Sequence, residues 1–168
     1  MSQFDALDFT EVDVPDVLAL QIDGQCPCDP AAIGAAMGPL FGRLMPTMQQ
    51  HGLTPMGPPR SIYTAYGPDG IRFTVAMPVV SPPSQPIAED AGRVGTVKGG
   101  KAMRFTHRGP YAGLMGTYGR IIEFLKARDL MQTEDDWMRY MPMWEEYLND
   151  PQTTPETDLL TYIYLPVT

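Results

Sequence analysis

Two adjacent carboxylates lie among aromatic side chains in the stretch PMWEEYLNDP, residues 142–151. Glu145 and Glu146 stand between Trp144 and Tyr147, in a stretch typical of a strand that ends in a turn. Successive side chains of a strand point to opposite faces, so one glutamate is expected to reach solvent and the other to face whatever lies beneath the sheet. A carboxylate beside aromatic rings can bind a hydrophobic cation through charge pairing and cation–π attraction. It can also act as a general acid or base, because partial burial raises the pKa of a glutamate.

Alternation sorts the side chains of this strand into two sets. Met143, Glu145 and Tyr147 share one face, and Trp144 and Glu146 share the other. Each set combines a carboxylate with an aromatic ring, so alternation alone does not decide which set faces a binding groove.

The last predicted strand, LLTYIYLPV (159–167), has aliphatic side chains on one face and Tyr162 and Tyr164 on the other. The aliphatic face suits a helix-covered core, so we expect both tyrosines to face the groove, each with one polar edge in water. A plainer interpretation stays open, because tyrosines on strands are often packing residues and paired glutamates are often solvated.

The chain carries the same pattern twice, which indicates an internal duplication. The period-two runs GIRFTVAMPVV (70–80) and DLLTYIYLPV (158–167) both contain a Pro-Val pair near their ends, and a helical stretch with a Gly-Arg pair lies upstream of each run. Each half is therefore predicted as strand, helix, strand, strand. The expected elements are 17–23, 31–53, 60–66 and 70–79 in the first half, and 101–107, 111–130, 143–148 and 159–167 in the second.

These repeats predict one α+β domain, residues 1–168, built as a tandem duplication of a strand-helix-strand-strand module with pseudo-two-fold symmetry. The first half covers about 9–80, a crossover rich in proline and glycine covers about 81–98, and the second half covers about 99–168. Helices on one face of two short sheets would leave the opposite faces to meet around a ligand groove between the halves.

The repeat also predicts that the groove is asymmetric. Aligning Tyr66 with Tyr147 makes Tyr66 a candidate ligand contact and places Thr64 where the second half has Glu145. One side of the groove is therefore expected to be acidic and aromatic, and the other side smaller and more neutral.

The composition excludes several function classes. The chain has 168 residues, 43% of them hydrophobic, and a net charge of −8 without a basic run, so we expect no direct nucleic-acid binding. The sequence contains no apolar run of membrane-spanning length and no apolar core in its acidic N-terminal stretch, so we expect a cytoplasmic protein without membrane contact. Cys26, Cys28, His51 and His107 are too few and too scattered for a metal site, and we expect no cofactor.

Several motifs give the chain a resemblance to a known family. GGKAMRFTHRGPY (99–111) resembles the Gly-Gly, strand, His-x-Gly-Pro-Tyr segment of GyrI-like domains, also called AraC effector-binding domains. WEEYLNDP (144–151) and TDLLTYIYLPV (157–167) resemble that family's Glu-x-Tyr, Asn-Asp-Pro and Pro-Val pattern, and FTVAMPVV (73–80) resembles the end of its first half. The resemblance covers nearly the whole chain, with the first strand, the first helix and the CPC insertion matching least. It implies a stand-alone GyrI-like domain of two strand–helix–strand–strand modules.

The resemblance also implies roles for particular residues. In drug-sensing members of the family, a glutamate ringed by aromatic side chains receives cationic lipophilic ligands. By motif, that role falls on Glu145 and Tyr147, with Glu146 on the solvent side, and His107 would anchor the strand-to-helix turn. Trp137 and Trp144 could each cover the groove or pack outside it. The full set of expected ligand contacts is Glu145, Tyr147, Tyr162, Tyr164, Trp144, Tyr66 and Met143.

We therefore expect a multidrug-binding or drug-sequestering module for hydrophobic, cationic small molecules, acting alone, as a homodimer or through a protein partner. The alternative is an enzyme, because some GyrI-like proteins are similar to hydrolases that open the cyclopropane ring of DNA-alkylating natural products. Glu145 would then be catalytic by activating water, and Tyr147 or Tyr164 would donate to the developing oxyanion. Inhibition of DNA gyrase rests on the family name alone, and haem binding would need an axial ligand facing the groove.

Overall fold

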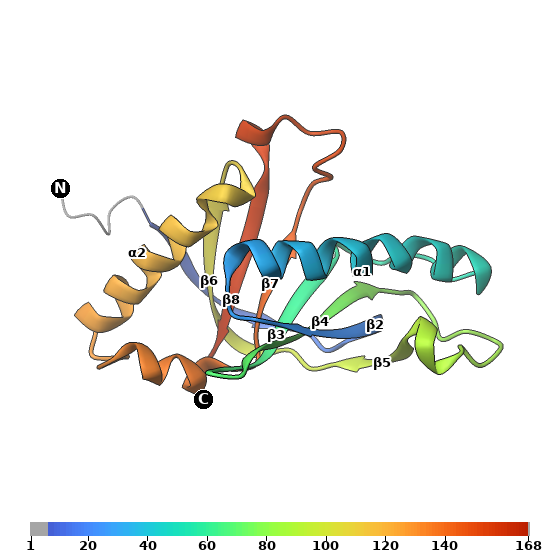
Figure 1. Cartoon of the computed structure of the whole chain (residues 1–168), viewed down its shortest axis with the longest axis horizontal. Coiled ribbons are helices and arrows are strands. Elements are labelled where there is room, and N and C mark those ends of the chain that lie inside the picture. The colour runs from blue at the N-terminus through green and yellow to red at the C-terminus, as the bar shows by residue number, and fades with distance from the viewer. Residues whose placement is uncertain (1–6, 168) are drawn as a thin grey trace.

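The computed structural model describes residues 7–167, so the start of the acidic N-terminal segment, residues 1–6, lies outside the described residues. The chain forms one mixed α+β unit (Figure 1). Its strands are β1 (Asp8–Val14), β2 (Val17–Cys26), β3 (Arg60–Gly67), β4 (Gly70–Pro78), β5 (Arg93–Val97), β6 (Gly100–Arg108), β7 (Met143–Tyr147) and β8 (Leu160–Pro166). The α-helices are α1 (Pro30–Gln50) and α2 (Leu114–Ala127), and the short 3₁₀ segments are η2 (Glu89–Ala91), η3 (Tyr111–Gly113), η4 (Glu134–Tyr140) and η5 (Glu156–Asp158).

The strands form a single antiparallel sheet in the order β1-β6-β8-β7-β3-β4-β2-β5. The first-half strands β2, β3 and β4 lie together, the second-half strands β6, β7 and β8 lie together, and β3 pairs with β7 where the halves meet. The halves therefore share one continuous sheet, whereas the sequence led us to expect two short sheets facing each other. The strand order has the symmetry that a duplication would produce, and the duplication itself stays a prediction.

The two edge strands, β1 and β5, were not expected from the sequence. β1 and β2 are joined by only Pro15 and Asp16 although they lie near opposite edges of the sheet, so the sheet must coil until its edges approach each other. The connection from β5 to β6 lies against the connection from β1 to β2. Lys98 Nζ lies 3.3 Å from Asp16 Oδ2, and the Gly99 amide donates to Asp16 Oδ1 at 2.8 Å.

Helix α1 begins where the sequence supplies both an acceptor and a proline. The Asp29 side chain accepts from the Ala32 amide at 3.1 Å, and Pro30 occupies the first helical position, where no N–H is needed. Pro39 and Pro46 both lie inside the continuous α1.

Both helices cover one face of the sheet, α1 over β2 and β4 and α2 over β6 (Figure 1). We call this the helix face. Its core combines Leu44 and Met48 of α1 with Ile121 and Leu125 of α2 and with Ile163 of β8. In the described part of the chain, no helix is long and apolar enough to cross a bilayer.

A second, smaller cluster of buried side chains lies on the opposite face of the sheet. Its members are Ala19, Ile62, Ala76, Ala102, Trp144 and Tyr164. Val14 of β1 and Val97 of β5, from opposite edges of the sheet, both pack against this cluster. The coiled sheet therefore curves around this side, and we call it the concave face.

Candidate functional site

Glu145 lies on the helix face near the centre of the sheet. Its strand pairs with β8 so that Glu145 stands opposite Ile163, and with β3 so that it stands opposite Ser61. Directly opposed residues of antiparallel strands share a face, and Ile163 belongs to the helix-covered core. Glu145 and its same-face neighbour Met143 are therefore buried, with 3% and 2% exposed. Glu146, which was expected on the solvent side, points to the concave face and is half-buried.

Three tyrosine hydroxyls surround the carboxylate of Glu145. Tyr63 of β3 donates to Oε1 at 3.2 Å, and Tyr147 of β7 donates to the same oxygen at 2.6 Å. Tyr118 of α2 donates to Oε2. Ser61 Oγ lies 2.9 Å from the Tyr147 hydroxyl and helps to fix the ring. We call Tyr63, Tyr118 and Tyr147 the tyrosine cage, which forms only when strands of both halves and α2 come together.

The cage tyrosines are held in their neutral form. Burial raises the pKa of Tyr63, Tyr118 and Tyr147 well above the ordinary value of 10.0, and the negative charge of Glu145 raises these pKa values further. The Tyr118 ring is only half-buried, but its hydroxyl points inward to Glu145, which is why burial is still the largest cause. All three hydroxyls therefore act as donors to the carboxylate at neutral pH.

Further aromatic rings extend the cage along the helix face. Phe41 of α1 and Tyr111 of η3 contact the Tyr147 ring edge-on, at centroid distances of 5.7 Å and 5.6 Å. Trp137 of η4 contacts the Tyr118 ring edge-on at 6.0 Å. Of the two tryptophans considered above, Trp137 is thus the one on the same side as the carboxylate.

No basic side chain balances the charge of Glu145 in the described part of the chain, because none of the ion pairs there includes it. Glu146 differs, since its Oε2 lies 3.6 Å from Arg60 Nε. A buried, uncompensated carboxylate is unfavourable unless donors or a cation satisfy it. Within residues 7–167, no group of His, Cys, Asp or Glu side chains is arranged to hold a metal ion.

Trp144, Tyr162 and Tyr164 were expected to line the groove with Glu145, and the structure places them on the concave face. Trp144 stands opposite Tyr164, with the two rings stacked at 4.9 Å and 11°, and Glu146 stands opposite Tyr162. The predicted alternation of side chains along β7 and along β8 was right. However, the side of β8 that carries Tyr162 and Tyr164 lies on the same face of the sheet as Glu146, and not on the face of Glu145. These three residues therefore do not contact the tyrosine cage.

Tyr66 was also expected to contact the ligand, and the structure does not bring it to Glu145. It is 42% exposed near the end of β3, and its pKa is raised chiefly by the neighbouring Cys28 thiol. Tyr63 donates to Glu145 instead, because β3 pairs with β7 so that Tyr63 stands opposite Met143 and Ser61 stands opposite Glu145.

His107 joins β6 to the start of α2. Its Nε2 lies 2.8 Å from the Pro110 carbonyl oxygen, and its Nδ1 lies 2.7 Å from Thr117 Oγ1, which also accepts from Arg120 at 3.1 Å. The carbonyl can only accept, so Nε2 carries the proton and Nδ1 accepts from Thr117. His107 thus fixes the helical turn that carries the cage residue Tyr118.

Sequence reasoning missed Tyr63 and Tyr118. Tyr118 lies at helical spacing with Leu114, Ile121 and Leu125, in an apolar stripe that is typical of core packing. A hydroxyl in an otherwise aliphatic stripe was the available signal, because a buried tyrosine needs a hydrogen-bond partner. For Tyr63, the missing information was the register of β3 against β7.

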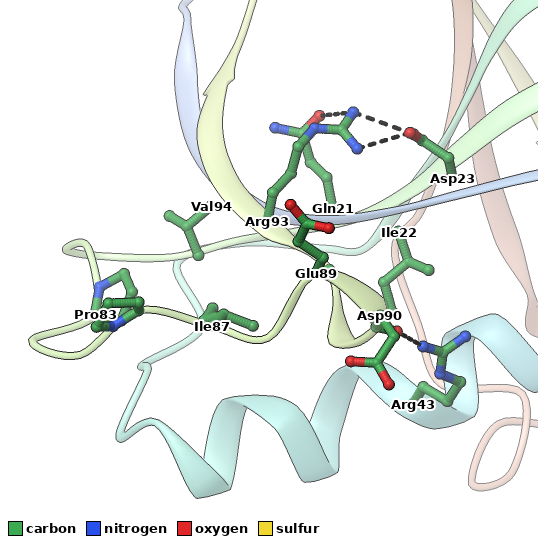
Figure 2. Close-up of a pocket in the computed structure, with 12 residues that line it drawn as sticks. Gln21, Ile22, Asp23, Arg43, Pro83, Ile87, Glu89, Asp90, Arg93 and Val94 are labelled. Atoms are coloured by element: carbon green, nitrogen blue, oxygen red, sulfur yellow. Dashed lines mark hydrogen bonds and ion pairs between the residues drawn. The ribbon is translucent and has the colours of Figure 1, made fainter.

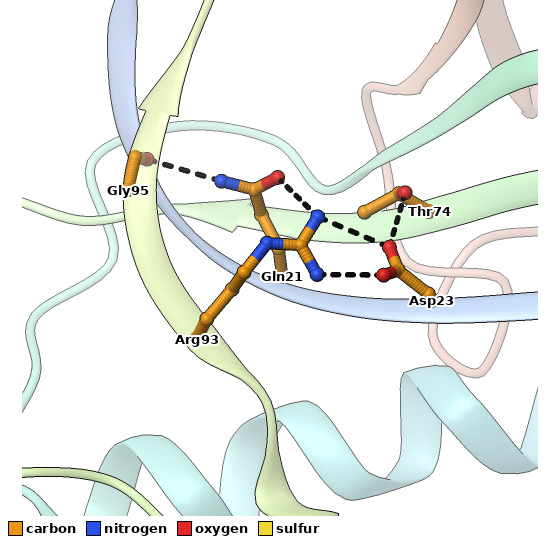
Figure 3. A network of polar contacts seen from close by, with 5 residues as sticks. All are labelled: Gln21, Asp23, Thr74, Arg93 and Gly95. Carbon is orange, nitrogen blue, oxygen red and sulfur yellow. Dashed lines mark hydrogen bonds and ion pairs between the residues drawn. The ribbon is translucent and has the colours of Figure 1, made fainter. Parts of the chain in front are cut away.

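Two surface hollows lie away from the tyrosine cage. One of about 680 Å³ lies between α1 and the start of β5, where Arg43 of α1 donates to the Asp90 carbonyl oxygen (Figure 2). The other, of about 700 Å³, is lined partly by Asp23, Thr74 and Arg93, whose polar groups bond to one another (Figure 3). Asp23 and Arg93, which line both hollows, form an ion pair with each other. We therefore place the candidate site at Glu145, whose buried charge has no counter-ion among residues 7–167.

A buried carboxylate enclosed by aromatic rings on an α+β scaffold is typical of a small-molecule-binding domain. The family model of the GyrI-like small molecule binding domain matches residues 7–168, and the chain belongs to this family. No curated protein sequence matches the chain.

Solved structures share the fold at low sequence identity. The EcmrR C-terminal domain is 15% identical, with a TM-score of 0.72 over 97% of this chain and 98% of that chain. SAV2435 bound to tetraphenylphosphonium is 12% identical, with a TM-score of 0.62 over 96% of this chain and 94% of that chain. A hydrolase from Listeria innocua is 16% identical, with a TM-score of 0.55 over 96% of this chain and 92% of that chain.

Proposed function

We propose that the chain binds hydrophobic, cationic small molecules at Glu145. The observation that carries this proposal is a carboxylate, 3% exposed, that is held by tyrosine hydroxyls and by no basic side chain among residues 7–167. A lipophilic cation would supply the missing counter-charge without requiring a strongly hydrated group to enter an aromatic site. Tetraphenylphosphonium, the ligand of the similar SAV2435 structure, has this chemistry.

The aromatic surroundings support both affinity and breadth. Rings of Phe41, Tyr111, Tyr147, Tyr118 and Trp137 offer several faces and edges beside one charge. Such faces attract cations of varied shape, because the attraction depends on the ring and needs no directional hydrogen bond. A multidrug-binding or drug-sequestering role follows from this breadth. The cytoplasmic location and a homodimer or protein partner stay predictions.

A hydrolase is the second candidate, favoured by the likeness to the Listeria innocua hydrolase and by one contact. Tyr147 lies 2.6 Å from Glu145, close enough to donate to an oxyanion that forms beside the carboxylate. Glu145 would then activate water for attack on a strained electrophile such as a cyclopropane ring. Tyr164 cannot take part, because it lies on the opposite face of the sheet.

The test is calorimetry of the purified chain with tetraphenylphosphonium, neutral triphenylphosphine oxide and anionic tetraphenylborate. We expect saturable binding of the cation, at least tenfold tighter than binding of either control. Equal affinity for all three would contradict the charge-based proposal. Mass spectrometry after incubation with cyclopropane-bearing alkylators separates the candidates, because a hydrolase adds one water to its substrate and a binding module returns it intact.

A further inference from the structure

On the concave face, two arginines and one tryptophan have buried N–H groups that find no acceptor within the described part of the chain. These groups are Nε and Nη1 of Arg60, Nε of Arg104 and Nε1 of Trp144. Arg60 is 6% exposed and Trp144 is 5% exposed, so bulk water does not surround them. Buried donors are almost always paired in folded proteins, and several unpaired donors on one face indicate an acceptor that residues 7–167 do not supply.

Strand register and direct contacts join these donors into one group. Arg60 stands opposite Glu146, and Tyr164 stands between Trp144 and Arg104 on the adjacent strands. The Tyr164 hydroxyl donates to Glu146 Oε1 at 3.0 Å, and Arg60 Nε lies 3.6 Å from Glu146 Oε2. Arg104 also stacks its guanidinium on a ring, at 4.2 Å from the centroid of Tyr162. We call this set the arginine cluster: Arg60, Arg104, Trp144, Glu146, Tyr162 and Tyr164.

The arginine cluster has more positive charge and more donors than its own acceptors can satisfy. Of its two guanidinium groups, that of Arg60 pairs with the single carboxylate of Glu146, and that of Arg104 lies beside the Tyr164 hydroxyl and the Tyr162 ring. The 3.6 Å separation from Arg60 is an ion pair but is too long for a hydrogen bond, and the other oxygen of Glu146 accepts from Tyr164. This local excess of positive charge contrasts with the net charge of −8 of the whole chain.

A nearby arginine whose terminal N–H groups are paired within the protein serves as a comparison. Arg93, on the same face, places Nη1 2.8 Å from Asp23 Oδ2 and Nη2 3.3 Å from Gln21 Oε1 (Figure 3). Thr74 completes that network by donating to Asp23 Oδ1 at 2.6 Å. The chain therefore satisfies this exposed arginine internally and leaves the buried Arg60 with free donors.

We infer that the arginine cluster binds a small oxyanion, with the size and charge of phosphate, sulfate or a carboxylate group. Guanidinium groups present parallel N–H donors that match two oxygens of such an anion, and the indole N–H supplies a further donor. Arg104 and Tyr162 are partly exposed, which gives the anion a route to the buried donors. This site lies on the opposite face of β7 from the tyrosine cage and does not depend on the proposed cation site.

The test is a phosphate titration followed by NMR of the two tryptophan indole N–H groups. Ionic strength is held constant with sodium chloride, and comparison with Trp144→Phe assigns the resonances. We expect the Trp144 signal to move downfield and to saturate with a Kd on the order of 1 mM or tighter, while the Trp137 signal stays in place. Parallel titrations with sulfate and acetate show whether a tetrahedral oxyanion or a carboxylate fits better.

Calorimetry of variants tests which side chains hold the anion. Arg104→Gln and Trp144→Phe should each weaken phosphate binding at least tenfold, and Arg60→Gln should remove it. Arg93→Gln is the matched control, because its partners lie within the protein, and its Kd should stay within twofold of wild type. If Arg60→Gln fails to fold, the other two substitutions decide the result.

Three outcomes would overturn the inference. The first is an indole signal that does not respond to any oxyanion beyond the effect of chloride. The second is an equal loss of phosphate binding in Arg93→Gln and Arg104→Gln, which would indicate general surface attraction. The third is unchanged phosphate binding in Trp144→Phe and Arg104→Gln together.

Discussion

Glu145 and Glu146 are neighbours in sequence and carry their charges to opposite faces of one sheet. Glu145 accepts hydrogen bonds from the tyrosine cage on the helix face, and Glu146 accepts from Tyr164 and pairs with Arg60 on the concave face. The first carboxylate thus has no counter-ion in the described part of the chain, and the second is matched with a cation of the chain itself. Strand alternation sends the two side chains to opposite faces, and the pairing of β7 with β3 and β8 gives them different partners.

Tyr118→Phe should destabilise the chain and strengthen cation binding. The substitution removes the donor to Glu145 Oε2, and hydrogen bonds to charged groups contribute about 1.5 to 3 kcal/mol. We expect the free energy of unfolding in urea to fall by about that amount. The freed oxygen should bind tetraphenylphosphonium severalfold more tightly, because a competing donor is gone while the aromatic ring remains.

Tyr164→Phe is the matched control for Tyr118→Phe. It removes a donor from Glu146 on the concave face, at 3.0 Å, and leaves the tyrosine cage intact. Its affinity for the cation should equal that of wild type. A tenfold weaker affinity in Tyr118→Phe would show instead that the Tyr118 hydroxyl contacts the ligand.

Stability should fall steeply as pH rises above about 10. The cage tyrosines have pKa values well above 10.0 in the folded state, because of burial and then of Glu145, whereas unfolded tyrosines ionise near pH 10. Above that pH the folded state binds more protons than the unfolded state, so stability decreases by about 1.4 kcal/mol per pH unit for each tyrosine. Below about pH 10 this contribution is fully present.

Urea unfolding between pH 8 and 11 measures this slope. In Tyr118→Phe the slope should be smaller by about 1.4 kcal/mol per pH unit, because one raised pKa is removed. Identical slopes in the two proteins would mean that Tyr118 ionises normally in the folded state.

His107→Phe should cost about 2 kcal/mol of stability, because it leaves the Thr117 hydroxyl and the Pro110 carbonyl oxygen without their partner. His51→Gln, at the C-terminal end of α1, should change stability by less than about 0.5 kcal/mol. Thermal and urea unfolding give both values. Unchanged stability in His107→Phe would contradict its role as an anchor of α2.

The positions of helices and strands could be predicted from local sequence more reliably than the pairing of the strands with one another. The period-two runs at β4 and β8 and the helical spacing of α2 are local patterns, and each lies within a few residues of the expected position. β1 was missed because its sequence, DFTEVDV, is rich in acidic residues that are uncommon in strands, and β5 was missed because it lies in a segment where glycines and prolines obscure alternation. The coil of the sheet depends on which edges meet, and no local pattern encodes that.

The candidate site shows the same limit. Glu145 and Tyr147 were chosen from their motif, and the structure brings them together at 2.6 Å. Tyr162 and Tyr164 were placed with them because strand alternation gives two faces for each strand but not which faces match across strands. That match is set by the pairing of Glu145 with Ile163, a long-range contact.

The most direct test of the account is calorimetry of Glu145→Gln with tetraphenylphosphonium and with neutral triphenylphosphine oxide. The amide keeps the size of the side chain and an acceptor for the tyrosine hydroxyls but removes the charge. We predict that the Kd for the cation rises at least tenfold, about 1.4 kcal/mol, while the Kd for the neutral compound changes less than twofold. An equal change for both compounds, or none for either, would contradict the claim that the buried charge of Glu145 selects the ligand.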